Sequence, residues 1–245
     1  MLQAFLSVSR YRHGARSMES IVGVSSLSGK RCFDPSSLPQ LNQLDMHVPA
    51  WEFVAWVQFR TLLKSREESL AEAFHDCYCK SLLGRGYHYG PEDDEGKMTK
   101  KCLVPFDQLE PSYKGDNRRA VRDVPDKLAA AGYAAIPLPD GSSPDLPDEM
   151  LEHLAELEHD GWLRSKIACA WSYAPVRNEE LRQHPAMLPW KPLTVEERAV
   201  RYPENPEAVG LEELPENEKR KDRDQIQGMM GVLRKLRYEL IQVGG

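Results

Sequence analysis

Apolar residues recur at helical spacing in several long stretches of the chain. Residues 51–63 are strongly apolar with short polar breaks, which predicts a helix that packs on the rest of the fold. Residues 65–83 place apolar side chains three and four positions apart before two glycines, so a second helix is expected to end there. Residues 147–167 repeat this pattern, with Pro147 at or near the first helical position. The fold is therefore expected to be mainly α with minor β.

Short aromatic and apolar segments follow the second and third of these helices. The aromatic turns lie at residues 86–91 and 170–175, and an apolar run after each one ends at Pro105 or Pro189. Aromatic and β-branched residues suit strands, so each turn is expected to pair with the following run as a small ribbon.

The remaining segments complete the expected element order. Closing helices are predicted over residues 125–131 and 223–243, the first starting at Pro125 because proline lacks the N–H that a helix interior needs. Residues 1–50 show no sustained periodicity and are expected to be irregular or partly disordered, with Met18 as the expected start of the protein. Residues 137–147 are rich in proline and predict a rigid linker.

The order of elements repeats because the sequence itself is duplicated. Residues 70–91 align with residues 154–175 at a constant offset of 84, with 8 of 22 positions identical, where chance gives about one or two. The offset rises to 105 by Asn117 and Asp222, so the second copy carries 21 extra residues within 194–215, a stretch whose Pro and Gly predict a surface loop. We expect two tandem modules of helix, ribbon and helix, related by a pseudo-twofold axis. The expected organisation is a lead-in (1–50), a first module with its preceding helix (51–136), a linker (137–147) and a second module (148–245).

Composition excludes several classes of protein. A net charge of −6 argues against a protein that coats DNA or RNA, although a local basic pocket stays open. Five cysteines without CxxC spacing support neither a zinc site nor a disulfide framework, and they favour the reducing cytoplasm. No apolar stretch approaches the ~18 residues of a membrane span. We expect a cytoplasmic protein without a metal or a cofactor.

Three motifs in the second copy carry a family resemblance. They are the His-Asp-Gly-Trp segment at 159–162, the Trp-Ser-Tyr-Ala-Pro segment at 171–175 and the Leu-Pro-Trp segment at 188–190. Together they resemble the ryanodine-receptor repeat (RyR) domain. The first copy follows the same pattern with tyrosine at both Trp162 and Trp171 positions, and the two copies cover about residues 65–245. The resemblance implies a tandem-repeat protein of the small prokaryotic or viral type.

The resemblance implies that the protein binds a nucleotide-derived ligand between the two copies. This ligand would be either an adenine nucleotide or a cyclic nucleotide signal. The protein would then be a non-catalytic sensor or sponge, in one setting a component of phage–host immune signalling. Tyr78 and Trp162 are expected to sandwich a ring, at ~1–3 kcal/mol per stacked base. Arg177 is expected to contact phosphate, and Asp93 at the same position of the first copy predicts asymmetric binding. The candidate ligand-binding residues are His75, Tyr78, Lys100, His159, Trp162, Arg177 and His184.

Structural roles compete with these assignments. Aromatic residues at helical spacing more often belong to a core, and His75 and His159 serve equally well as bridges inside their own modules. Arg177 and Lys100 have the alternative of being solvated surface charges. Asp160 is expected to bond local backbone or an arginine of the closing helix rather than a ligand.

Two other classes of function remain open. The His-Asp pairs at 75–76 and 159–160 also suggest a metal-dependent HD-type phosphohydrolase. A protein-interaction module is suggested by the apolar helix at 51–63 and the charged stretch at 211–224. The first hypothesis predicts no catalytic residue and a small-molecule partner, and it leaves homo-oligomerisation open.

Overall fold

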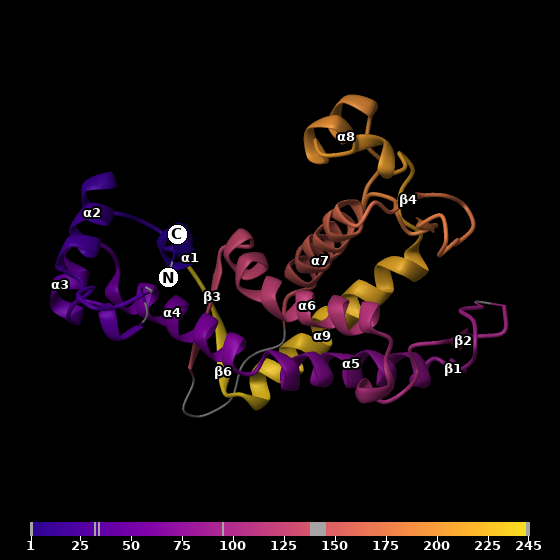
Figure 1. Cartoon of the computed structure of the whole chain (residues 1–245), viewed down its shortest axis with the longest axis horizontal. Helices are drawn as coiled ribbons and strands as arrows, with labels where there is room; N and C mark the ends of the chain where they lie inside the picture. The colour runs from indigo at the N-terminus through magenta and orange to yellow at the C-terminus, as the bar shows by residue number, and fades with distance from the viewer. Residues whose placement is uncertain (1, 32, 34, 95, 138–145, 244–245) are drawn as a thin grey trace. The chain divides into compact units, whose positions relative to one another are not determined.

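The computed structural model describes residues 2–31, 33, 35–94, 96–137 and 146–243 (Figure 1). It is mainly helical with small two-stranded sheets, as the hydrophobic pattern predicted. The chain forms two compact units, which consist of residues 1–70, 121–144 and 232–245 in unit 1, and 71–120 and 145–231 in unit 2. Both units therefore contain segments of both sequence copies.

The first 50 residues are more ordered than the sequence predicted. Helices α1 (Leu2–Ser7), α2 (Ala15–Val24) and α3 (Leu41–Asp45) form there, with a 3-10 turn at Pro35–Ser37. Helix α4 (Ala50–Ser65) confirms the apolar helix predicted at 51–63. The expectation of an irregular lead-in was wrong because these short helices bury only one or a few apolar side chains each, largely against α4, and so leave no periodic signal.

The two copies meet in a pair of strands in unit 1. Strand β3 (Tyr133–Pro137) pairs antiparallel with β6 (Tyr238–Gln242), and Ala135 lies opposite Leu240 at the centre (Figure 1). Residues 135 and 240 are equivalent at the offset of 105, so this pairing is itself twofold symmetric. The helix predicted over 223–243 is corrected accordingly, because a strand whose partner is 105 residues away has no local signature.

Four long helices match one another in pairs. Helices α5 (Glu67–Gly84) and α7 (Asp148–Ala168) confirm the two predicted module helices. The closing helices are α6 (Pro111–Ala130) and α9 (Glu216–Lys235), both of which start earlier than predicted.

Pro125 lies inside α6 rather than at its start, contrary to the sequence prediction. Proline in a helix interior costs about 3 kcal/mol, whereas a fully buried aliphatic side chain contributes ~1.5–3 kcal/mol. Val121, Val124 and Leu128 are all buried around it, which outweighs the lost backbone bond. The predicted linker at 137–147 falls mostly outside the described residues, and its first residue ends β3.

Each module of unit 2 carries a short ribbon in the same register. Strand β1 (His88–Tyr89) pairs with β2 (Thr99–Lys100), and β4 (Ser172–Tyr173) pairs with β5 (Gln183–His184). The predicted ribbons are confirmed, but their second strands are polar and precede the apolar runs that were expected to form them. Met98 and the equivalent Arg182 both have left-handed φ values, 53° and 52°. Each residue turns the chain immediately before the second strand of its ribbon.

The 21-residue insertion is structured, which corrects the prediction of a surface loop. Helix α8 (Val195–Arg201) begins with a capping box between Thr194 and Glu197, and a 3-10 turn follows at Pro206–Ala208. Tyr202, Ala208 and Val209 are buried in one cluster with side chains from α7. The apolar residues of the insertion follow no single period, so sequence reasoning treated them as loop residues.

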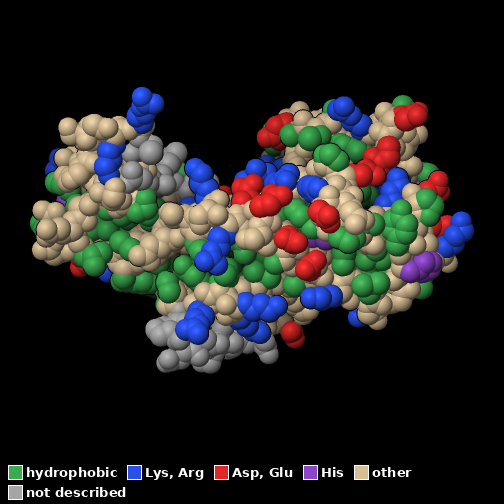
Figure 2. Space-filling view, turned by 60° about the horizontal axis from the view of Figure 1, so that its bottom comes forward, with side chains coloured by type: hydrophobic (Ala, Val, Ile, Leu, Met, Phe, Trp, Pro, Cys, Tyr) green, Lys and Arg blue, Asp and Glu red, His purple; other side chains and the backbone are tan. Residues whose placement is uncertain are grey.

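Charged side chains of both signs are mixed on the face drawn in Figure 2. Single-sign fields are what attract polymeric nucleic acid, so this view agrees with the charge argument from the sequence. None of the helices that the structure describes combines the length and the apolar character needed to span a membrane.

We predict that Tyr202→Phe destabilises the protein by about 1–2 kcal/mol. Its hydroxyl donates a hydrogen bond to Asp160 Oδ1 at 2.7 Å, and Asp160 would keep only its arginine partners. Urea unfolding followed by circular dichroism measures the change. Tyr89→Phe is the matched control, because Tyr89 is 59% exposed. Equal midpoints for the two variants would show that the insertion is not anchored through this bond.

Candidate ligand-binding pocket

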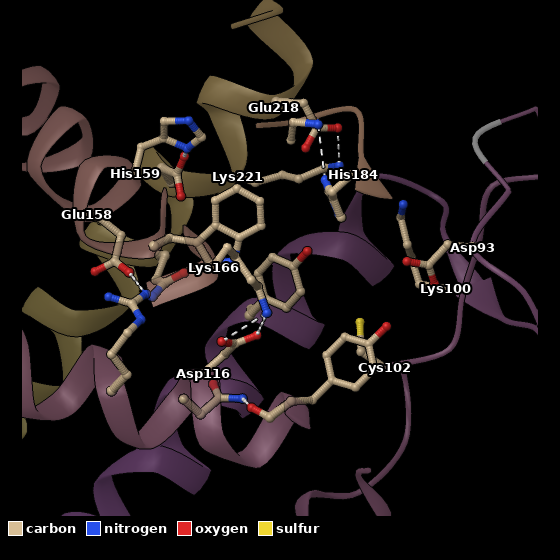
Figure 3. A pocket seen from close by; sticks show the side chains of 18 of the residues that line it. Asp93, Lys100, Cys102, Asp116, Glu158, His159, Lys166, His184, Glu218 and Lys221 are labelled. Atoms are coloured by element: carbon tan, nitrogen blue, oxygen red, sulfur yellow. Dashed lines mark hydrogen bonds and ion pairs between the residues drawn. The ribbon is translucent and has the colours of Figure 1, made fainter. Parts of the chain in front are cut away.

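A cavity of about 480 Å³ opens within unit 2. Its walls come from α5 and α6 of the first copy, α7 and α9 of the second, and the ribbon segments of both (Figure 3). All seven residues that the sequence singled out line this cavity. Their convergence is a structural fact, whereas a ligand contact by any of them stays a prediction.

Equivalent positions of the two copies line this one cavity, and few of the equivalent side chains are alike. The pairs at the offset of 84 are Phe74 and Glu158, His75 and His159, Tyr78 and Trp162, Asp93 and Arg177, Lys100 and His184, and Cys102 and Ala186, and those at 105 are Tyr113 and Glu218, Asp116 and Lys221, and Asn117 and Asp222.

The two dyad histidines form the same internal bond in each module. His75 Nε2 lies 2.8 Å from the carbonyl oxygen of Val104, and His159 Nε2 lies 2.8 Å from that of Leu188, which is the equivalent residue. Both rings are buried, and each ties its helix to the apolar run that follows the ribbon. The structure thus shows the bridging role that the sequence left open.

His159 has a further partner in Asp222, whose Oδ2 lies 3.2 Å from its Nδ1. Burial disfavours the charged ring, but the hydrogen bond and the negative charge of Asp222 outweigh it and raise the pKa of His159 above its usual value. Asn117 holds the equivalent position in the first copy, so the two histidines differ electrostatically.

The aspartates of the two His-Asp pairs lie in environments that differ from those of the neighbouring histidines. Asp76 is exposed, and Asp160 accepts hydrogen bonds from Tyr202 and from Arg201 Nε at 3.0 Å. The expected bond between Asp160 and an arginine of the closing helix is therefore wrong, since Tyr202 and Arg201 of the insertion and Arg164 of its own helix bind it. Over the described ranges, no group of three His, Cys, Asp or Glu side chains is placed to hold a metal ion.

Trp162 stands between two side chains of its own helix. Its ring stacks on His159 at 5.6 Å between centroids, and Lys166 Nζ lies 5.8 Å from its centroid. One residue is a turn before Trp162 and the other a turn after, so both are its neighbours on the helix surface. A ligand ring stacked on the face of Trp162 that Lys166 covers would have to displace this lysine. Tyr78 faces the cavity from α5, and burial raises its pKa well above the usual value, which keeps it a neutral phenol.

Asp93 and Arg177 form an ion pair with each other, at 3.1 Å between Oδ2 and Nη1. Because the two residues hold equivalent positions and contact each other, two like charges here would repel. Arg177 also binds Glu179 through Nε at 2.6 Å. The charge difference between these two positions was expected to make ligand binding asymmetric. In the structure it allows an ion pair between the two copies.

Lys100 is only 7% exposed, which corrects the alternative that it is a solvated surface charge. Its ammonium lies 5.7 Å from the centre of the Tyr87 ring, a cation–π geometry. The lysine that occupies β2 is therefore directed into the module rather than outward.

His184 is a neutral group in this setting. Its Nδ1 accepts a hydrogen bond from the Ala186 N–H at 3.0 Å, which leaves the proton on Nε2. Burial lowers its pKa to about 3, and the nearby positive charges of Arg177 and Lys166 add to this effect.

Several charged residues of the pocket escaped the sequence analysis. Lys166 Nζ binds Asp116 at 2.9 Å, Arg119 binds Glu158 at 2.6 Å, and Lys221 binds Glu218, as Figure 3 shows for the carboxylates and lysines it labels. Identity between the two copies gives no signal for Lys166 and Glu158, because the equivalent residues are the apolar Leu82 and Phe74.

We predict that His184→Gln removes a loss of stability that occurs as pH falls from 7 to 5. The pKa of His184 in the folded protein lies below the ordinary value of ~6.5, so the unfolded chain binds a proton there that the folded chain does not, and the contribution of His184 to stability falls as pH falls. Glutamine cannot titrate, so the variant should lose roughly 1–2 kcal/mol less over this range. Urea titrations at several pH values measure it, with the exposed His88→Gln as control. Identical slopes in all three proteins would refute the neutral assignment.

The two modules also agree with a known family. The RyR domain matches residues 54–136 and 143–205, more than half of the chain and most of both copies. The second match ends inside the insertion, after the last residue of α8. With its duplicated helices, ribbons and histidine bridges, the chain belongs to the RyR domain family.

Proposed function

We propose that this protein binds a small nucleotide-derived ligand in the unit 2 pocket and does not convert it chemically. The observation that carries the proposal is the pocket itself, where aromatic rings from both copies meet convergent charged groups. Its volume of about 480 Å³ falls in the ~300–1,000 Å³ range of small-molecule sites. Tyr78, Trp162 and Trp171 provide ring faces and edges of the type that nucleobases pack against.

The state of the reactive side chains favours binding over catalysis. The Nε2 atoms of His75 and His159 are taken up by backbone carbonyls, so neither is poised as a general base. Burial raises the pKa of Cys79 to about 12 and that of Cys102 to about 11, which suppresses the thiolate forms that nucleophilic attack requires. These environments support a binding role rather than the HD-type phosphohydrolase.

As a sensor, the protein would change conformation or partner when the ligand binds, whereas as a sponge it would only lower the free ligand concentration. In the setting that the family resemblance implies, either role acts on a nucleotide signal of phage–host immunity. Displacement of Lys166 from Trp162 is one local change that a ligand stacked on this ring face would cause, and it is compatible with both roles.

A co-purified ligand is the most direct test of this function. The purified protein is denatured, and the released small molecules are identified by mass spectrometry. We expect a nucleotide-derived compound in the extract, and calorimetry with that compound should show binding at one site per chain. If the extract is empty, calorimetry with a panel of nucleosides and nucleotides replaces it, and no heat with any member contradicts the proposal.

We predict that Trp162→Leu weakens ligand binding about 5–150-fold while the protein stays folded. Loss of one stacked base costs ~1–3 kcal/mol, which corresponds to that range. Trp51→Leu is the matched control, because Trp51 is 54% exposed and lies in unit 1. Circular dichroism checks the fold of both variants. Unchanged affinity in a folded Trp162→Leu protein would remove this ring from the site.

A further inference from the structure

The charges around the pocket balance. Among the described lining residues there are five acidic and five basic side chains, apart from the histidines. The acidic ones are Asp93, Asp116, Glu158, Glu218 and Asp222, and the basic ones are Lys100, Arg119, Lys166, Arg177 and Lys221. Four ion pairs join members of the two sets. A pocket of this type offers no net positive charge to a ligand.

Four of the five basic side chains, all except Arg119, nevertheless lie close enough to His184 for their charges to act on it. Lys166 and His184 both lie against the rings of Trp162 and Trp171. Lys100 occupies the ribbon position equivalent to His184. Figure 3 shows Lys221 next to His184. With its Nδ1 held by the Ala186 N–H, the neutral His184 can donate from Nε2. We call Lys100, Lys166, Arg177, His184 and Lys221 the His184 corner.

Two of the five carboxylates, Glu158 and Asp222, are paired outside this corner and lie next to His159. Asp222 contacts the His159 ring, and Glu158 sits beside it on α7, buried and bonded to Arg119. Glu218, Asp93 and Asp222 are the acidic groups whose charge acts on the Tyr78 hydroxyl. A carboxylate has about four acceptor sites, so each one in an ion pair still accepts from a hydroxyl or an amino group. Glu218 is paired with Lys221 and so borders the His184 corner. We call Glu158 and Asp222 the acidic wall.

Phosphate number decides how well a nucleotide suits such a pocket. One phosphate fits the His184 corner, where lysines, an arginine and a neutral donor converge. Each further phosphate adds negative charge to a pocket without net charge, and it approaches carboxylates in a partly desolvated space, which is unfavourable. Hydroxyl and amino groups of a nucleoside, in contrast, match the acceptors of the acidic wall.

We infer that the pocket selects a nucleoside that carries a single phosphate, as a monoester or a cyclic diester, over nucleoside di- and triphosphates. The phosphate occupies the His184 corner, and donors of the ribose or the base meet the acidic wall. This inference rests on the proposed function and names the ligand class of the same pocket.

Calorimetry without divalent metal tests the selection on the full-length protein. The probes are the four common ribonucleosides with their 5′-mono-, 5′-di- and 5′-triphosphates and their 3′,5′-cyclic monophosphates. For the base that binds best, we expect the monophosphate or the cyclic form to bind tightest, and each further phosphate to weaken binding at least about tenfold. A di- or triphosphate that binds as tightly as the monophosphate overturns the inference and leaves the proposed function standing. No binding by any probe overturns both.

A charge variant separates electrostatics from shape. Asp116→Asn removes the carboxylate partner of Lys166 and gives the pocket one net positive charge. The ratio of triphosphate to monophosphate affinity should then rise severalfold, while the affinity for the uncharged nucleoside stays unchanged. Asp45→Asn is the matched control, because it removes the same charge from an ion pair with Arg12 in unit 1, where Asp45 is 54% exposed. Glu218→Gln repeats the test from another helix. If the ratio moves in neither pocket variant, charge balance does not set the selection.

Discussion

Asp93 and Arg177 hold the same position in the two copies of the module, and they form an ion pair with each other at 3.1 Å. Two identical charged residues in this place would repel, so the two copies have to differ at this position. Most of the equivalent positions that line the pocket also differ in charge, as at Asp116 and Lys221. The two copies thus contribute unlike sides to one pocket.

Burial then determines the charge state of the site. Charges in a half-buried cavity need partners, and Lys166, Arg119 and Arg177 each have a carboxylate within ion-pair distance. His184 remains neutral, with its pKa lowered to about 3, and so avoids the free-energy cost of burying a charge. The result is a site whose acidic and basic side chains are mostly paired with one another and equal in number among the described lining residues. Balanced charge of this kind favours recognition through the arrangement of donors and acceptors over recognition through total charge.

The insertion makes the second half of the pocket different from the first. Tyr202, Ala208 and Val209 fill the cluster against which Trp162 and Trp171 pack, and Tyr202 and Arg201 hold Asp160. In the first copy no insertion occurs, and the equivalent Asp76 is exposed. One wall of the pocket therefore rests on a support that is absent from the other, which agrees with an asymmetric ligand.

The sequence by itself determined the duplication, the module helices, the existence of the ribbons and the seven residues that gather at the pocket, because these features depend on local periodicity and on identity between copies. Only the tertiary structure decided what each side chain does there. The strand after Lys235 and the helix through Pro125 depend on packing partners far along the chain. Lys166 and Glu158 left no trace in the comparison of copies, since their equivalents are apolar, and their roles follow from the residues that folding places opposite them.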